Sequence, residues 1–130
     1  MFINGRERIT ASEVASFLGE DPVLLYGQFL DDYKRASIED KILLIQDAPI
    51  QTADRPVHYE ALLAAVCESL AKQDGIPIPE WVYEQRYYLK EPVFAFNTTI
   101  PGHREYLLET TPEEFLSRNV IFGDNVMSRC

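Results

Sequence analysis

The residues best suited to contact a ligand lie close together, where aromatic side chains are interleaved with a cation: Tyr83, Arg86, Tyr87 and Tyr88. Aromatic rings next to arginine can stack on nucleic-acid bases. The same residue types are enriched in protein–protein interfaces, and they also pack in protein cores. Because the chain is acidic, we place core packing first, and contact with a protein ahead of contact with nucleic acid.

Neither the histidines nor the cysteines stand at a spacing that predicts a metal site or a nucleophile. They are His58, His103, Cys67 and Cys130, and none has the spacing of zinc ligands. A Cys67–His58 pair would have to meet across about two and a half helical turns, which the geometry forbids. The isolated Cys67 fits better as a small buried side chain.

Carboxylate pairs occur at Glu80 with Glu84 and at Glu113 with Glu114. Acid–base catalysis would need a desolvated cleft around them, whereas a solvated helix N-terminus suits them without one. The sequence has no P-loop and no G-x-G-x-x-G motif. We therefore expect no catalytic residue, no metal and no cofactor.

The charge of the chain argues against nucleic-acid binding. Its 12 basic and 21 acidic residues give a net charge of −9, and none of three successive segments, 1–36, 37–75 and 76–130, is net positive. Nucleic-acid binders usually present a basic face. An acidic chain instead suits a protein partner with a basic surface, or self-association.

Length and composition indicate one domain, residues 1–130. A chain of 130 residues with 46% hydrophobic residues can bury a core of its own. No apolar run approaches the roughly 20 residues that cross a bilayer. With no secretory signal pattern and no disulfide framework, we expect a cytoplasmic protein and no membrane contact.

The clearest element is a helix over residues 59–73. Its predicted buried face recurs with helical period at Tyr59, Leu62, Leu63, Val66 and Leu70. Glu68 and Lys72 stand four apart, as in an exposed ion pair. Gly75 predicts the end of the helix.

The sequence of the N-terminal half predicts a turn followed by helices. Asn4-Gly5 favours a hairpin over residues 2–9, with a disordered arm as the alternative. Capping patterns predict helices over 10–18, from Asp21-Pro22 to about residue 33, and over 38–46. The predicted buried residues of the last two helices are Leu25, Phe29, Tyr33, Ile38, Ile42 and Ile45.

Residues 76–130 are predicted to form short helices and loops that pack around the preceding helices. We expect a short helix over 80–86, with Trp81 anchored in the core, then helical turns or extended pieces at 87–89 and 93–96. Further short helices are expected at 105–109, with Leu107 and Leu108 inward, at 111–116, and as a last turn through Met127. Arg118 is expected to pair with a nearby carboxylate, for which Glu114, four residues earlier, is a candidate, and Asn119 to cap a helix end.

Two resemblances add to this reading. The segment Ile9-Thr10-Ala11-Ser12-Glu13-Val14-Ala15-Ser16-Phe17-Leu18-Gly19 resembles the first helix and turn of excisionase-like and MerR-like helix-turn-helix domains. Such domains insert the next helix into the DNA major groove. Here that helix carries no Arg or Lys before Lys34, so its charge does not suit DNA.

The longer resemblance covers residues 37–130. It rests on Ala48-Pro49, Asp54-Arg55, Tyr59-Glu60-Ala61-Leu62-Leu63-Ala64, Glu68-Ser69-Leu70-Ala71, Ile76-Pro77-Ile78-Pro79-Glu80-Trp81, Pro112-Glu113-Glu114-Phe115 and Arg118-Asn119-Val120-Ile121-Phe122. This pattern resembles a small, uncharacterised bacterial domain that occurs alone or behind an Xre-type helix-turn-helix. The resemblance implies a regulator or an antitoxin-like protein, and it transfers no catalytic residue.

We therefore predict a mainly all-α fold, a small bundle in which residues 1–36 form a helix-turn-helix-like part and 37–130 a helical domain. The predicted function is a non-enzymatic interaction or regulatory protein. The alternatives are a DNA-binding regulator that uses residues 10–30, and a small enzyme with a pocket near Trp81 and Tyr87. The candidate interaction surface comprises Tyr83, Arg86, Tyr87, Tyr88, Arg118 and Asn119.

Overall fold

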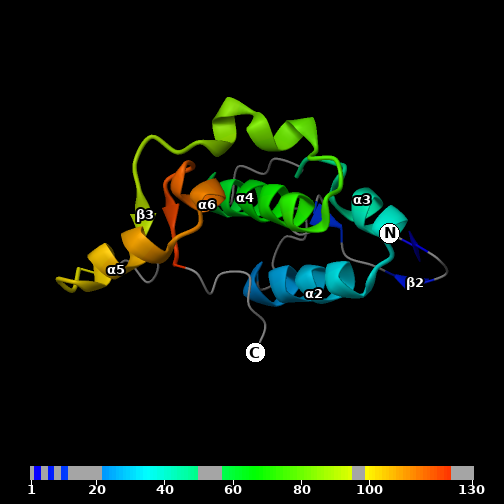
Figure 1. Cartoon of the computed structure of the whole chain (residues 1–130), viewed down its shortest axis with the longest axis horizontal. Coiled ribbons are helices and arrows are strands. Elements are labelled where there is room, and N and C mark those ends of the chain that lie inside the picture. The colour runs from blue at the N-terminus through cyan, green and yellow to red at the C-terminus, as the bar shows by residue number, and fades with distance from the viewer. Residues whose placement is uncertain are drawn as a thin grey trace.

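The fold is built around α4, the helix Val57–Asp74. The computed structural model describes residues 2–3, 6–7, 10–11, 22–49, 57–94 and 99–123. In Figure 1, α4 runs through the middle of the molecule, with α2 on one side and the η1–η2 segment on the other. From Glu60 to Ala71, every residue except Leu62 is buried. The helix is thus covered on all sides, and the mainly α-helical fold is confirmed.

Shorter elements surround this helix. The other described α-helices are α2 (Pro22–Arg35), α3 (Ile38–Ile45), α5 (His103–Thr110) and α6 (Glu113–Leu116), and the 3-10 helices are η1 (Glu80–Tyr83) and η2 (Gln85–Tyr87). Strands β1 (Phe2–Ile3) and β2 (Arg6–Glu7) pair antiparallel, with Phe2 opposite Glu7, which confirms the predicted hairpin. Strands β3 (Val93–Phe94) and β4 (Val120–Ile121) pair in parallel, with Val93 opposite Val120.

The helices α2 and α3 begin where their sequence signals predict. Helix α2 starts at Pro22, and Phe29, Leu30 and Tyr33 are buried. The Ser37 side chain caps α3 by accepting a hydrogen bond from the backbone N–H of Asp40. The predicted helix over 10–18 lies outside the described residues apart from its first positions, and so does the predicted turn through Met127.

Polar contacts at the C-terminal end of α4 join three helices. The Tyr33 hydroxyl on α2 donates to Asp74 Oδ2 at 2.7 Å and also lies 3.3 Å from the backbone oxygen of Leu70. Lys41 on α3 pairs with Asp74 at 3.4 Å, and its Nζ lies over the Tyr33 ring. Burial and the bond to Asp74 raise the pKa of Tyr33, so it stays a neutral donor. Helix α4 ends at Asp74, and the next residue, Gly75, has a φ of +67°, which suits glycine.

Some side chains predicted to be buried are exposed. Ile38, in the first turn of α3, is 52% exposed, because that helix packs into the core through Leu44 and Ile45 near its other end. Tyr59 lies in the first turn of α4 and is also exposed. On α5 only Leu107 faces inward, and Leu108, one position around the helix, is exposed. The predicted burial of Ile38, Tyr59 and Leu108 was therefore wrong, and that of Leu107 is confirmed.

The segment 80–87 corrects a second prediction. It forms two 3-10 turns rather than one helix, because Glu84 between them is extended, with φ −62° and ψ 137°. This break lets Trp81 and Val82 from the first turn, and Tyr87 from the second, all reach the core around α4. Trp81 anchors the segment as predicted, since its Nε1 donates to the backbone oxygen of Ile45 at 2.9 Å.

The last elements that the structure describes are α5, α6 and β4. Thr111, which follows α5, donates its hydroxyl to the Leu107 backbone oxygen of α5 and accepts from the Gly123 N–H. It therefore connects the end of α5 to the residue at which the described chain ends. Helix α6 begins at Glu113, with Pro112 just before it, and packs Phe115 into the core. Of the helices that the structure describes, none is long and apolar enough to cross a bilayer.

Candidate interaction site

An open groove lies beside η2 and β3, in the segment that the sequence singles out. It has a volume of about 750 Å³ and is lined by Gln85, Arg86, Tyr88, Leu89, Lys90, Glu91 and Val93. The lining combines apolar, aromatic and charged side chains from one continuous stretch of chain. A groove of this size falls within the range of ligand sites, roughly 300–1,000 Å³.

Backbone hydrogen bonds from the turn after α6 hold the groove in place. The Leu89 N–H donates to the Arg118 oxygen at 3.2 Å, and the Val93 N–H donates to the Asn119 oxygen at 2.8 Å. Asn119 Nδ2 donates in turn to the Leu89 oxygen at 2.7 Å. Both ends of the groove segment 89–93 are thus fastened to two consecutive residues, Arg118 and Asn119.

Asn119 adopts a left-handed backbone conformation, with φ of +62°. Asparagine tolerates this region better than most residues, and it commonly ends helices this way. The Asn119 N–H donates to the Leu116 oxygen at 3.0 Å, which closes the turn after α6. The turn directs the chain into β4, and the Asn119 amide donates to the Leu89 oxygen. The C-cap of α6 is Ser117, so the predicted cap at Asn119 was placed two residues too far along the chain.

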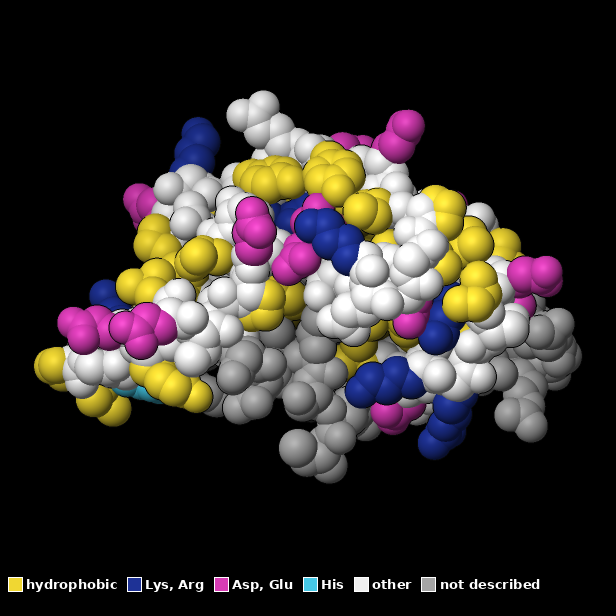
Figure 2. Space-filling model, in the orientation of Figure 1, with side chains coloured by type: hydrophobic (Ala, Val, Ile, Leu, Met, Phe, Trp, Pro, Cys, Tyr) yellow, Lys and Arg dark blue, Asp and Glu magenta, His cyan; other side chains and the backbone are white. Residues whose placement is uncertain are grey.

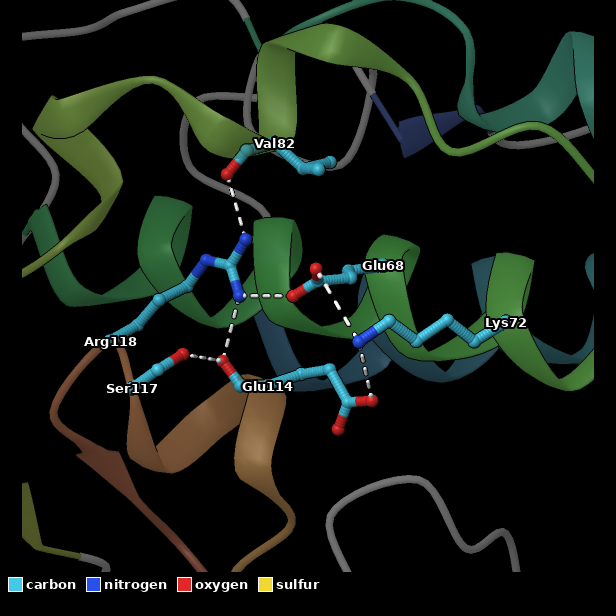
Figure 3. A network of polar contacts seen from close by, with 6 residues as sticks. All are labelled: Glu68, Lys72, Val82, Glu114, Ser117 and Arg118. Carbon is cyan, nitrogen blue, oxygen red and sulfur yellow. Dashed lines mark hydrogen bonds and ion pairs between the residues drawn. The ribbon is translucent and has the colours of Figure 1, made fainter.

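Arg118 is fully buried and ties together elements that are far apart in sequence (Figure 3). Its Nη1 donates to Glu68 Oε1 on α4 and to the Glu114 backbone oxygen, both at 2.7 Å. Its Nη2 donates to the Val82 oxygen of η1 at 2.8 Å. The guanidinium also lies 4.7 Å from the centre of the Tyr88 ring. A single side chain therefore connects α4, α6, η1 and the groove wall.

Glu68 supplies the compensating negative charge. Its side chain is 8% exposed, pairs with Arg118, and lies 3.7 Å from Lys72 Nζ. Burial by itself raises the pKa of Glu68, but hydrogen bonds from Arg118 and Tyr83 and the nearby positive charges outweigh it, so the pKa is lowered. The carboxylate therefore stays ionised, and the buried Arg118 keeps its partner.

Lys72 and Tyr83 complete the network at the surface. Lys72 lies 3.4 Å from Glu114 Oε1 as well as near Glu68, and it is about half exposed. Burial is the largest single influence and lowers the pKa of Lys72, but the two carboxylates together outweigh it, so the pKa is raised overall. The hydrogen bond to Glu68 is the main reason why the pKa of Tyr83 is raised. The polar network thus runs from the core outward to the side of η1.

Arg86 lies on the groove edge and is held by its neighbours. Its Nε pairs with Glu84 Oε2 at 2.9 Å, and its Nη2 donates to the Tyr87 hydroxyl at 2.7 Å. The guanidinium carbon lies 4.8 Å from the centre of the Tyr87 ring. Burial raises the pKa of Tyr87, and the nearby Arg86 only partly offsets this. Arg86 is thus oriented over a neutral tyrosine with Nη1 still unused among these contacts.

The structure divides the six residues of the sequence-predicted surface. Tyr83 and Arg86 are exposed, and Tyr88 and Asn119 are half-buried. Tyr87 and Arg118 are fully buried, because they pack against α4 and its neighbours, so they belong to the interior and not to a surface. Two pairing predictions are only partly confirmed. Arg118 does pair with a carboxylate, but it is that of Glu68, and at Glu114 it contacts the backbone oxygen. Glu68 and Lys72 do form the predicted pair at 3.7 Å, but Glu68 is buried rather than exposed.

Sequence reasoning missed most of the groove. Gln85, Leu89, Lys90, Glu91 and Val93 were not identified as site residues, although all five line it. The available signal was the charged and rigid stretch Lys90-Glu91-Pro92 between two apolar runs, which marks an exposed bend. The missed partner of Arg118, Glu68, carried no local signal, because it lies 50 residues away.

A second, smaller groove of about 440 Å³ lies at Trp81, between α3 and the segment before η1. It is lined by Ile42, Gln46, Asp47, Ala48, Pro77, Ile78, Pro79, Glu80 and Trp81. Its two ionisable groups, Asp47 and Glu80, are exposed. Tyr87, the other residue named for an enzymatic pocket, does not line it. The enzyme alternative stays a prediction.

The remaining chemical candidates are placed as follows. Cys67 is buried in α4, and burial raises the pKa of its thiol, so it packs as a small apolar side chain. Among the described residues, no group of three or more His, Cys, Asp and Glu side chains could hold a metal ion. On the face drawn in Figure 2, acidic and basic side chains are interspersed, and apolar side chains gather beneath the η1–η2 segment.

Comparisons of the chain with protein-family models, with curated proteins and with solved structures yielded no match. The resemblances noted in the sequence therefore stay predictions, and the function is argued from the site alone.

Proposed function

We propose that this protein is a non-enzymatic interaction protein, and that its groove beside η2 and β3 binds a segment of a partner protein. The observation that carries the proposal is the groove itself: an open, mixed apolar and charged surface of about 750 Å³. It combines tyrosine and arginine with aliphatic side chains, the residue types that interfaces favour. A regulatory or antitoxin-like role would fit such a surface.

The anchoring of the groove supports binding rather than a merely irregular surface. Three hydrogen bonds between residues 89 and 93 and the pair Arg118 and Asn119 fix the backbone of residues 89–93 before any partner binds. A preformed site loses less conformational entropy on binding, so more of the contact energy contributes to affinity. Gln85, Lys90 and Glu91 meanwhile leave their side chains exposed to a partner.

The experiment is affinity purification from the native host with three forms of the full chain. They are the wild type, a groove variant that combines Gln85→Arg with Lys90→Glu, and the control Lys34→Glu, which changes an exposed lysine on α2. We expect one protein to co-purify at equal molar amounts with the wild type and the control, and not with the groove variant. Equal recovery with all three, or no stoichiometric partner with any of them, would contradict the proposal.

The acidic character of the chain adds an independent expectation. A partner with a basic surface would be attracted by the net charge of −9, which raises the association rate at low salt. Stopped-flow association with the co-purified partner measures this directly. The association rate should fall as salt rises from about 50 to 500 mM, because counter-ions screen the long-range attraction. A rate that is unaffected by salt would remove the basic-surface expectation and leave the groove proposal in place.

A further inference from the structure

We infer that the smaller groove at Trp81 is a second binding site, and that it takes a basic segment of a partner protein, in which lysine or arginine side chains stand beside aliphatic ones. This Trp81 groove, of about 440 Å³, lies before η1, whereas the groove of the proposed function begins at η2. In Figure 1 the two places lie toward α3 and toward β3, at the two ends of the η1–η2 segment. The inference rests on the proposed role as an interaction protein and assigns it a different surface.

The Trp81 groove carries negative charge that is not balanced within the described residues. Asp47 and Glu80 are the ionisable side chains of its described lining, and both are exposed. Neither forms an ion pair with a cation of the described chain. The cation of α3, Lys41, is held by Asp74 at 3.4 Å. Two negative charges therefore face a ligand, on a chain whose total charge is −9.

The end of α3 adds to this negative potential. Gln46, the C-cap of α3, lines the groove together with the two residues that follow it. The C-terminus of a helix carries a partial negative charge, because its last carbonyl groups have no partner within the helix, and cations are favoured beside it. The last turn of α3 contains no basic residue of its own. A lysine or arginine of a partner would supply the missing positive charge.

The hydrogen-bonding groups of the lining favour the same ligand chemistry. The two carboxylates only accept hydrogen bonds, and Pro77 and Pro79 have no N–H to donate. The indole Nε1 of Trp81 is already used, since it donates to the Ile45 oxygen. Among the described lining side chains, the amide of Gln46 is the remaining donor. Lysine and arginine, which only donate, match this lining, whereas a carboxylate or a phosphate does not.

The rest of the lining is apolar and is held in shape. Ile42, Ala48 and Ile78 line the groove and are half-buried. Exposed Ile38 lies four residues before Ile42, on the same side of α3, and extends the apolar surface. The indole hydrogen bond joins the two walls, which are the end of α3 and the segment before η1. The groove therefore exists before a partner binds, and aliphatic side chains of the partner would bury apolar area in it.

Other occupants match the Trp81 groove less well. A nucleic acid or an acidic peptide would bring negative charge to a lining that has two carboxylates and, among the described residues, no cation. A second copy of this chain would bring a net charge of −9. An uncharged aliphatic segment would bury the same apolar area but would leave both carboxylates without a cation. Charge and hydrogen bonding thus favour a basic segment over each of these.

The test starts from a displayed library of random 12-residue peptides without tryptophan, selected on the full-length chain. Trp81 lines the groove and is the only tryptophan, so a change in its fluorescence identifies the selected peptides that bind there. We expect these peptides to carry Lys or Arg beside aliphatic residues. At about 50 mM salt, their affinity should weaken roughly two- to fivefold in Asp47→Asn and in Glu80→Gln. Reversing both charges, in Asp47→Lys with Glu80→Lys, should weaken it roughly tenfold or more.

The matched control is Glu113→Gln. It removes the same charge from the chain, but at an exposed site on α6 that does not line the groove. Peptide affinity should be unchanged in this variant, because a distant exposed charge is largely screened. Urea midpoints close to that of the wild type would show that all variants are folded.

Several results would overturn the inference. They are acidic or uncharged peptides among those that change the Trp81 fluorescence, no selected peptide that changes it, affinity that is insensitive to both groove substitutions, or an equal loss in Glu113→Gln. The two proposals fail separately. A host partner that depends on the groove beside η2 and β3, together with any of these results, removes only this inference. Basic peptides that respond as expected, with no host partner dependent on that other groove, remove only the proposed function.

Discussion

Removing the charge of Glu68 should strongly destabilise the protein. Glu68→Gln keeps the shape of the side chain and one acceptor oxygen, but it leaves the positive charge of the fully buried Arg118 guanidinium without its compensating negative charge. Breaking a buried ion pair from one side typically costs about 3–5 kcal/mol, because the other charge stays desolvated. The total free energy of unfolding of a folded domain is about 5–15 kcal/mol, so this loss would be a large fraction of it.

Urea unfolding followed by the fluorescence of Trp81, the only tryptophan, measures this loss. In thermal unfolding, at roughly 3–5 °C per kcal/mol for a chain of this length, the melting temperature should fall by roughly 9–25 °C. The matched control is Glu113→Gln, which removes an exposed carboxylate at the start of α6 and should change stability by less than about 0.5 kcal/mol. A loss below about 1 kcal/mol for Glu68→Gln, with an unchanged urea slope, would refute the reasoning.

A double variant separates the ion pair from simple packing damage. Arg118→Met alone leaves Glu68 with Lys72 and Tyr83, both nearer the solvent, but it also leaves the buried Val82 oxygen without its donor, so it too should be destabilising. Combining Arg118→Met with Glu68→Gln removes both charges and should recover part of the loss, since replacement of a whole buried pair is often near neutral. Losses that simply add would show that the two side chains do not interact.

Three further predictions concern the core and the pH dependence. Val66→Asp and Leu63→Asp each bury a charge on the covered face of α4, at sites 0% and 2% exposed, and should abolish cooperative thermal unfolding followed by circular dichroism. Trp81→Phe should lower the free energy of unfolding by about 1–3 kcal/mol in urea titrations followed by circular dichroism, because it leaves the Ile45 oxygen without its donor. The folded-state pKa of Glu68 lies below its ordinary 4.5, so its stabilisation is complete above that value and is lost as the pH falls through the folded-state pKa. Acid titration of stability should therefore show a smaller decrease in Glu68→Gln than in the wild type.

The parts of the fold that could be predicted from sequence are those with a local cause. The helical period of residues 59–73, the Ser37 cap and the stop at Gly75 each depend on residues within a few positions, and each appears in the structure. The parallel pairing of β3 with β4 and the Glu68–Arg118 ion pair join residues far apart in sequence. No local pattern marks such contacts, so Glu68 was read as an exposed member of an i,i+4 pair.

The same distance effect explains why the groove was only partly found. The residues that line the groove come from one short stretch of sequence, and its aromatic and cationic members were recognised. The shape of the groove depends on the hydrogen bonds that residues 118 and 119 form with residues 89 and 93, which are distant in sequence. Tyr87 and Tyr88 are adjacent and chemically alike, yet the first is buried and the second lines the groove. Adjacent positions in an irregular segment point in different directions, and only the packing of that segment decides which one is exposed.

The position of Arg118 links occupancy of the groove beside η2 and β3 to the stability of the whole fold. The same residue holds Leu89 through its backbone oxygen and holds α4 and η1 through its guanidinium. A partner segment that binds only the folded chain stabilises it by RT ln(1 + [L]/Kd), about 2.7 kcal/mol at a hundredfold excess over Kd. Glu68→Gln should therefore be partly rescued by a saturating concentration of that segment, while its affinity per folded molecule changes little unless the groove backbone moves. An affinity loss measured under conditions where Glu68→Gln is fully folded would show that the buried ion pair also sets the shape of the groove.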